Sequence, residues 1–245
     1  MIPKVIHYCW FGHHPLPPLA KECILSWKKF LPGYEVKEWN EDNFDVNAIK
    51  YTSEAYEEGK FAFVSDYARF WILYHYGGLY FDTDVKLVKP IDDIIAKGGF
   101  MGCESDSLSG ATSIMVNPGL GLGCEKGDPI YEALLKHYAT LSFYHSDGSP
   151  NLCTIVDYTT EVLASMGMSQ QTGIQEVGSI TIYPSDYFNP IHFITKRLHI
   201  TENTRSIHYG AASWQPHGLH ARFKSFIRRM LPESMLITFN KLKHG

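Results

Sequence analysis

The chain has 245 residues, of which 44% are hydrophobic, 20% charged and 14% aromatic. This size and composition are typical of one ordinary globular domain, and they exclude a disordered protein and a small domain that depends on disulfides. The net charge of −4 argues against a nucleic-acid-binding protein. Residues 217–245 hold six basic residues and one acidic residue, a net charge of +5, which leaves −9 for the rest of the chain.

The compartment is indicated by the cysteines and by the N-terminus. The five cysteines are odd in number and none are spaced as CxxC, which favours a reducing compartment over a disulfide framework or a zinc site. The N-terminal segment MIPKVIHYCWFG lacks the apolar run of a secretory signal, and no run is long enough to span a bilayer. These features predict a cytoplasmic protein whose fold starts at its first residues.

The first predicted elements are two strands and a helix. Residues 4–9 are short and apolar-rich and predict the first buried strand. Residues 13–19 contain three prolines and predict a loop, and residues 20–30 have helical periodicity. Residues 34–39 alternate between apolar and polar side chains, which predicts the second strand.

The segment from residue 61 to 88 predicts a buried helix that leads into a central strand. Residues 62–76 contain no glycine or proline, and Gly77-Gly78 ends the helix because glycine adopts the left-handed conformation readily. Residues 79–81 predict a short buried strand that ends at Asp82-Thr83-Asp84, and residues 85–88 continue extended. In open α/β sheets, ligands bind at this carboxyl end of the strands.

The remaining pattern alternates between strands and helices, which predicts an α/β fold with a mixed sheet. The elements are strands at 112–116, 179–183 and 204–208, helices at 129–141 and 153–166, and a basic amphipathic helix at 219–231. We expect Glu104 and Asp106 to lie in a solvated loop, with contact to an acceptor as the alternative. His7 is open to a core or a functional role, and Asn117 is a weak candidate for a contact with a sugar.

Asp82 and Asp84 form a DxD pair that predicts a metal site. Carboxylates at i and i+2 of a strand share one face, and at a strand end they can converge on one hard cation whose other ligands are phosphate oxygens. A DxD pair alone is common in solvated loops. Here the preceding helix carries Asp66 and Arg69, which are three residues apart and share a face. This charged pair is either a structural ion pair or reaches into the site to bind hydroxyls.

Three blocks give the chain a recognisable signature. Residues 2–12 read IPKVIHYCWFG, residues 65–85 read SDYARFWILYHYGGLYFDTDV, and residues 207–214 read IHYGAASW. The chain resembles the DxD-containing glycosyltransferases of family 32 and, more distantly, the catalytic domains of the clostridial glucosylating toxins. The resemblance spans residues 1–216 and implies a GT-A-type nucleotide-sugar-binding fold with a mixed central sheet. Residues 217–245 would then form a separate basic tail.

The resemblance implies a retaining, metal-dependent hexosyltransferase with a nucleotide-sugar donor. Its implied donor-binding residues are Trp10 on the base, Asp66 and Arg69 on the sugar hydroxyls, Asp82 on the ribose, and Ser213 and Trp214 on the diphosphate. Its implied metal ligands are Asp84 directly, Asp82 either directly or through water, and His208. Its implied catalytic set is Asp66, Arg69, Asp82 and Asp84. Without the resemblance, Trp10 is equally consistent with a core position, and a hydrogen-bonded interior position is the favoured interpretation of His208.

The chemistry of sugar transfer agrees with these roles. Transfer from a nucleotide sugar develops negative charge on the leaving phosphate, which a cation held by Asp84 and His208 would stabilise. Mixed oxygen and imidazole ligands suit Mn²⁺ somewhat better than Mg²⁺. The leaving diphosphate itself would accept the proton of the acceptor. We expect a UDP-linked donor and a glycan acceptor of capsule, O-antigen or exopolysaccharide synthesis.

The basic tail predicts a second partner, an anionic membrane surface. In residues 219–231, apolar side chains recur at helical spacing and four basic residues lie between them, which is typical of helices that bind membrane surfaces. The alternative is a C-terminal helix that packs on the domain. A lipid-linked acceptor would favour contact with the inner face of the plasma membrane.

Two other functions are weighed against this one. A catalytically silent nucleotide- or carbohydrate-binding homologue would not need Asp66, Arg69, Asp82, Asp84 and His208 all intact. A metal-dependent phosphohydrolase would share the DxD pair, but it leaves Trp10 and the Ser213-Trp214 block unexplained.

Overall fold

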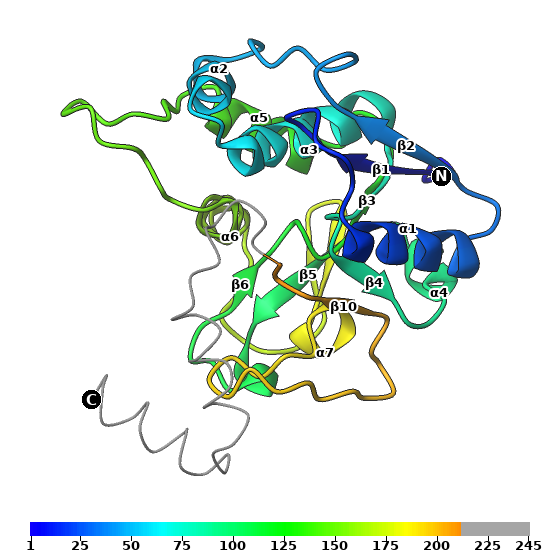
Figure 1. The fold of residues 1–245 in the computed structure, drawn as a ribbon. Helices are drawn as coiled ribbons and strands as arrows, with labels where there is room; N and C mark the ends of the chain where they lie inside the picture. Colours follow the sequence, from blue (N-terminus) through cyan, green and yellow to red (C-terminus); the bar gives the residue numbers. More distant parts are fainter. Residues whose placement is uncertain (212–245) are drawn as a thin grey trace.

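The computed structural model describes residues 1–211, which form a mixed eight-stranded sheet beside a two-stranded one (Figure 1). In spatial order the main sheet contains β2 (Glu35–Trp39), β1 (Val5–Cys9), β3 (Gly78–Tyr80), β7 (Leu122–Cys124), β5 (Gly99–Ser105), β9 (Ile180–Tyr183) and β8 (Gln175–Val177). β6 (Met115–Val116) pairs with β5, and β4 (Val85–Leu87) pairs antiparallel with β10 (Ser206–His208). β2, β1 and β3 are parallel, so their carboxyl ends lie at one edge.

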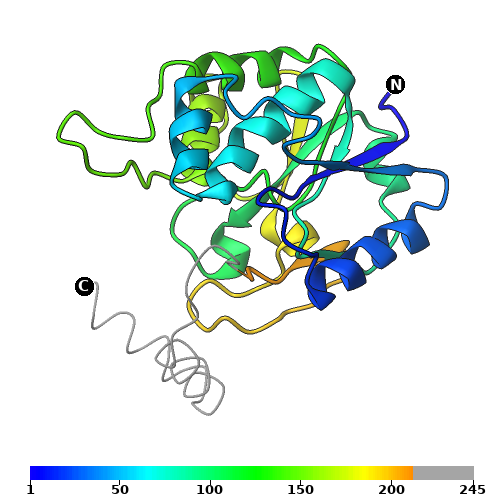
Figure 2. The same cartoon turned by 45° about the horizontal axis from the view of Figure 1, so that its top comes forward.

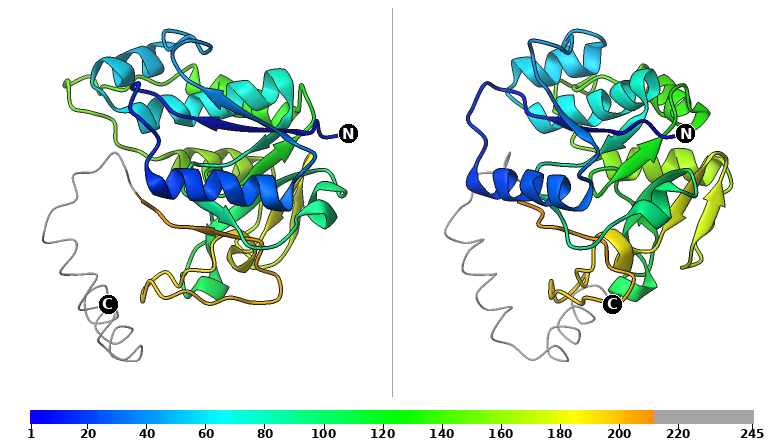
Figure 3. Two further views of the ribbon diagram at one scale, coloured as in Figure 1. Left: turned by 45° about the vertical axis from the view of Figure 1, so that its right-hand side comes forward. Right: turned by 90° about the vertical axis from the view of Figure 1, so that its right-hand side faces the viewer.

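Helices cover both faces of the sheet, and each face has its own hydrophobic core (Figures 2 and 3). One core receives α2 (Lys50–Glu57), α3 (Phe61–Tyr76), α5 (Pro129–Tyr138) and α6 (Ile155–Ser165). The other receives α1 (Pro18–Phe30), α4 (Asp92–Ile95) and α7 (Ser185–Phe188). This layering is the α/β architecture that the alternating pattern predicts. None of the helices within residues 1–211 is long and apolar enough to cross a bilayer.

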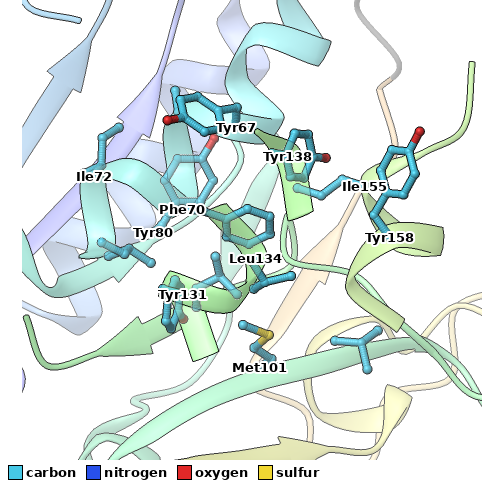
Figure 4. Packing of buried hydrophobic residues seen from close by; sticks show 14 of the residues in the cluster. Tyr67, Phe70, Ile72, Tyr80, Met101, Tyr131, Leu134, Tyr138, Ile155 and Tyr158 are labelled. Atoms are coloured by element: carbon cyan, nitrogen blue, oxygen red, sulfur yellow. The ribbon is translucent and has the colours of Figure 1, made fainter. Parts of the chain in front are cut away.

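Aromatic packing holds α3 against α5 and α6. Phe70 of α3 meets Tyr131 and Tyr138 of α5 edge-on, at ring-centroid distances of 6.1 and 5.9 Å (Figure 4). Tyr138 in turn contacts Tyr158 of α6 at 5.6 Å. Edge-to-face pairs of this kind stabilise a core beyond the area that they bury. The aromatic content of the chain is therefore used here for rigid support of α3, the helix that carries Asp66 and Arg69.

Most predicted elements are confirmed, with shifted ends. The predicted strands at 4–9, 34–39, 79–81, 112–116, 179–183 and 204–208 correspond to β1, β2, β3, β6, β9 and β10. The predicted helices at 20–30, 62–76, 129–141 and 153–166 correspond to α1, α3, α5 and α6. α1 begins two residues earlier than predicted, because Pro18 fits the first turn of a helix. The predicted helix at 219–231 and the boundary at residue 216 lie outside the described residues.

The expectation of a solvated loop at Glu104 and Asp106 is wrong. Glu104 belongs to β5, and Asp106 is only 1% exposed. The Asp106 carboxylate accepts hydrogen bonds from the Ser109 backbone N–H at 3.1 Å and from the Ser185 N–H and hydroxyl at 2.7 and 2.6 Å. Asp106 therefore caps a 3₁₀ turn at Ser107–Ser109 and the first turn of α7, which satisfies the donors that such turns leave free.

His7 is a core histidine of β1. It is 2% exposed, its Nδ1 accepts the indole N–H of Trp39 at 3.0 Å, and its Nε2 lies 3.0 Å from the carbonyl oxygen of Gly77. Because Nδ1 accepts, Nε2 carries the proton and donates to Gly77, so the ring is neutral. Burial lowers the pKa of His7 from 6.5 to about 4, although the bond to Gly77 opposes this. His7 thus ties the end of α3 to the first two strands.

We expect His7 to make the protein less stable in mild acid. Below pH 6.5 the unfolded chain binds a proton at His7 that the folded chain does not bind until about pH 4. The free energy of unfolding should therefore be unaffected by His7 above pH 6.5 and should fall by up to about 3 kcal/mol between pH 6.5 and 4. Urea denaturation at several pH values measures this slope. His7→Gln should flatten it, and the exposed His145→Gln should leave it unchanged; equal slopes in all three proteins would contradict the assignment.

Candidate active site

Asp82, Asp84 and His208 come together at the carboxyl edge of the parallel strands. The chain leaves β3 at Tyr80 and turns through the DxD pair into β4, so both acidic residues lie at a strand end. The antiparallel pairing of β10 with β4 sets His208 opposite Val85, next to Asp84. One ligand atom from each of the three side chains lies within 4.8 Å of the others. The structure thus joins the three predicted metal ligands, although His208 follows Asp84 by 124 residues in the sequence.

Asp84 and His208 form a hydrogen-bonded acid–base pair. His208 Nε2 lies 3.1 Å from Asp84 Oδ1, and Asp84 Oδ2 accepts the Ala211 N–H at 2.7 Å. Burial by itself would raise the pKa of Asp84. The hydrogen bonds from His208 and Ala211 together have the larger, opposite effect, so the pKa of Asp84 lies below its ordinary value. Burial lowers the pKa of His208, but the bond to Asp84 and the charges of Asp84, Asp82 and Glu104 raise it above its ordinary value. A cation bound here would replace the proton that the two side chains share.

Arg69 connects helix α3 to the DxD pair. Its guanidinium is 4.9 Å from the Tyr80 ring, and it lies 2.8 Å from Asp66 Oδ1 and 3.2 Å from Asp82 Oδ1. The Tyr80 hydroxyl also donates to Asp82, at 3.1 Å. Arg69 is 3% exposed, whereas the Asp82 side chain is 28% exposed, so the network is closed to water at Arg69 and open to it at Asp82. The Asp66–Arg69 pair is thus a structural ion pair that also contacts the DxD pair through Arg69, and its predicted contact with hydroxyls stays a prediction.

Asp66 is a buried carboxyl group of this network, and its pKa is raised. Burial raises its pKa, the charge of Arg69 lowers it and the charge of Asp82 raises it, with a net pKa of about 7. Asp66 is 8% exposed. Strongly shifted carboxyl groups beside a specific charge partner are typical of functional sites.

The backbone of Gly119 packs directly against Asp82. The Asp82 N–H donates to the Gly119 carbonyl at 3.1 Å, and a Cβ at position 119 would lie 2.0 Å from Asp82 Oδ2. The Gly119 N–H donates to Asn117 Oδ1 at 2.7 Å, which closes a tight turn. The sequence prediction did not include Gly119; the Asn117-Pro118-Gly119 turn signal was the available clue.

We expect Gly119→Ala to weaken metal binding about 10- to 100-fold, which is the usual cost of disturbing groups that orient a metal ligand. The added methyl group overlaps the Asp82 carboxylate and must displace it. Isothermal titration calorimetry with Mn²⁺ measures the affinity, and a thermal melt checks the fold. Gly33→Ala is the matched control, because a Cβ there meets nothing within 4 Å. A folded Gly119→Ala protein with the Mn²⁺ affinity of the wild type would contradict this role.

Trp10 follows β1 at the same sheet edge as the DxD pair. β1 and β3 are neighbouring parallel strands, so the chain beyond Cys9 and the chain beyond Tyr80 leave the sheet side by side. Trp10 is half-buried, and its indole N–H donates to the His14 carbonyl at 2.5 Å. Its contact with a nucleotide base stays a prediction. Ser213 and Trp214 lie outside the described residues, so their predicted contacts with a diphosphate also stay predictions.

The donor set of this site fits a divalent cation. Asp82 and Asp84 supply carboxylate oxygens and His208 an imidazole nitrogen, a combination suited to Mn²⁺ and acceptable for Mg²⁺. Asp84 is held by Ala211 and Asp82 by Tyr80, so both carboxylates are oriented by neighbouring groups.

Comparison with known proteins agrees with this site. Residues 17–101 match the model of the glycosyltransferase sugar-binding region containing a DXD motif. An inositol phosphoceramide mannosyltransferase of Schizosaccharomyces pombe is 31% identical over 111 residues, which are 41% of this chain and 33% of that protein. An uncharacterized glycosyltransferase of Acanthamoeba polyphaga mimivirus is 24% identical over 229 residues, which are 89% of this chain and 85% of that protein. The match thus spans about a third of the first relative.

The fold is also found in a solved glycosyltransferase structure. The PaToxG glycosyltransferase aligns with a TM-score of 0.52 and 18% identity over 67% of this chain and 69% of that one. The predicted resemblance and the GT-A-type fold are thereby confirmed. The part of the chain that matches the DXD sugar-binding model includes Asp66, Arg69, Asp82 and Asp84.

Proposed function

We propose that the protein is a metal-dependent glycosyltransferase that moves a hexose from a nucleotide sugar, UDP-linked, to a glycan acceptor with retention at the anomeric carbon. The observation that carries the proposal is the convergence of Asp82, Asp84 and His208 within 4.8 Å, next to Arg69 and Asp66. The match to the DXD sugar-binding region supports the reaction class. The donor type and the stereochemistry follow from the resemblance of residues 65–85 to family 32.

Each side chain has a role in this proposal. Asp84 and His208 hold a divalent cation with Asp82, and this cation supplies Lewis-acid stabilisation of the leaving phosphate. Arg69 orients the Asp82 carboxylate and, with Asp66, binds donor hydroxyls. Trp10 stacks on the base, and Ser213 and Trp214 donate hydrogen bonds to the diphosphate. The diphosphate then accepts the proton of the acceptor on the face from which it leaves.

We also propose the acceptor and the location. The acceptor is a lipid-linked intermediate of capsule, O-antigen or exopolysaccharide synthesis, a step that rests on analogy. The basic segment 217–245 binds the anionic inner face of the plasma membrane, and the protein is otherwise cytoplasmic. Truncation after Trp214 should abolish flotation with anionic liposomes; unchanged binding would overturn the membrane role.

Nucleotide release from a panel of UDP- and GDP-sugars tests the reaction. We expect release from one donor with Mn²⁺, no release with EDTA, and strongly reduced release with Asp84→Asn. Binding of UDP without release from any donor, even with glycan acceptors added, would instead identify a silent binding homologue. Phosphate release from simple phosphate esters would identify a phosphohydrolase.

A further inference from the structure

Glu104 lies at an irregular point of strand β5. The pairing of β5 with β6 shifts register between Cys103 and Ser105, so Glu104 sits in a bulge. Bulges commonly re-aim one side chain and leave its backbone without a ladder partner. Here the Glu104 carbonyl accepts the side-chain amide of Asn189 at 3.0 Å, which fixes the bulge. The Glu104 side chain is directed to Asn117, with Oε2 accepting the Asn117 Nδ2 at 2.8 Å.

This contact determines which way the Asn117 amide faces. A carboxylate is only an acceptor, so the NH₂ group of Asn117 must face Glu104. The carbonyl oxygen Oδ1 must then face the opposite way, where it accepts the Gly119 N–H at 2.7 Å. Asn117 is 8% exposed, and its own N–H donates to the Gly102 carbonyl at 3.0 Å. One amide therefore links the bulge of β5 to the turn at Gly119.

The turn at Gly119 also contacts Asp82 and fixes the position of its carboxylate. Its carbonyl accepts the Asp82 N–H at 3.1 Å, and the missing side chain leaves the space that Asp82 Oδ2 occupies. A shift of the turn by a few tenths of an ångström would move a metal-ligating carboxylate. The chain of contacts from Glu104 through Asn117 and Gly119 to Asp82 contains no gap.

We propose that Glu104 is a positioning residue of the metal site, acting through Asn117 and the Gly119 turn on Asp82. The inference rests on the proposed metal-dependent function of that site. Glu104 binds neither the metal nor the sugar in this role; it fixes the Asn117 amide by a hydrogen bond. A carboxylate that merely stabilised β5 would affect the melting temperature and leave the metal affinity unchanged.

Three variants separate these roles by Mn²⁺ affinity, measured by calorimetry without any donor sugar. Glu104→Ala removes the acceptor and should weaken Mn²⁺ binding about 10-fold or more. Glu104→Gln keeps an acceptor oxygen and should stay within about threefold of the wild type. Glu104→Ala with Asn117→Ala should be no weaker than Asn117→Ala alone, because the two residues act along one route. Glu176→Ala, an exposed glutamate of β8 in the same sheet, is the matched control.

Hydrogen exchange gives a readout without metal. Glu104→Ala should speed the exchange of the Gly119 amide, because that N–H donates to the Asn117 oxygen that Glu104 orients. Wild-type Mn²⁺ affinity in a folded Glu104→Ala protein would overturn the role of Glu104 and leave the proposed function of the site intact. So would an equal loss in Glu104→Gln, which would assign the effect to charge. A wild-type chain that binds neither Mn²⁺ nor nucleotide would overturn the proposed function itself.

Discussion

Replacing Asp84 with asparagine is expected to lower the rate of sugar transfer about 10³-fold. The substitution removes the negative charge that holds both His208 and the cation, and a cation supplies several kcal/mol of stabilisation to charge developing on a phosphate. Since each 1.36 kcal/mol is a tenfold rate effect, loss of about 4 kcal/mol gives this figure. The measurement is the initial rate of nucleotide release at saturating donor, with Mn²⁺ varied over several decades.

Asp147→Asn is the matched control, because Asp147 is an exposed aspartate in the loop between α5 and α6. It should release nucleotide at the wild-type rate. If Asp84→Asn retained most of its activity and the same Mn²⁺ dependence, Asp84 could not be a metal ligand, and the assignment of the DxD pair would have to be withdrawn.

Replacing Arg69 with methionine is expected to cost about 3–5 kcal/mol of unfolding free energy, because it leaves Asp66 buried without its partner. Methionine keeps most of the volume, so the loss arises from charge and not from a cavity. The double variant Asp66→Asn, Arg69→Met removes both charges and should recover part of this stability. Urea denaturation at pH 7 measures both differences.

The comparison variant for Arg69 is Lys136→Met. It breaks the exposed pair of Lys136 with Glu132 on α5, at 2.8 Å, and should change the free energy of unfolding by less than about 1 kcal/mol. If Arg69→Met were no more destabilised than Lys136→Met, the buried network would be as well solvated as a surface pair. Arg69→Met should also lose activity, since Asp82 loses its contact with Arg69.

The local pattern of the chain identified much of the fold around the site. Three elements are recognisable from a short stretch of sequence: β1 from its apolar run, β2 from its alternation, and α3 from its lack of glycine and proline. Gly77 and Gly78 marked the end of α3 correctly, because both have positive φ angles, of 65° and 102°. The DxD pair was placed at a strand end from the same segment.

The central strands β5 and β7 were missed for a physical reason. Glycine is rare in strands, and both strands contain it. A Cβ at Gly102 would lie 2.8 Å from Phe188, and one at Gly123 would lie 2.4 Å from Phe100. These glycines make room for aromatic rings that arrive from distant segments, so packing overrides the local preference.

Most candidate site residues were identified from the sequence alone, because the DxD pair, the Asp66–Arg69 spacing and the resemblance of residues 65–85 all lie within one short segment. Only the tertiary structure decided that His208 meets Asp84, that Arg69 bridges Asp66 to Asp82, and that Glu104 accepts a hydrogen bond from Asn117. These contacts join segments far apart in the chain, and strand pairing and core packing bring them together. Local periodicity records the shape of one segment and contains no information about which other segment it meets.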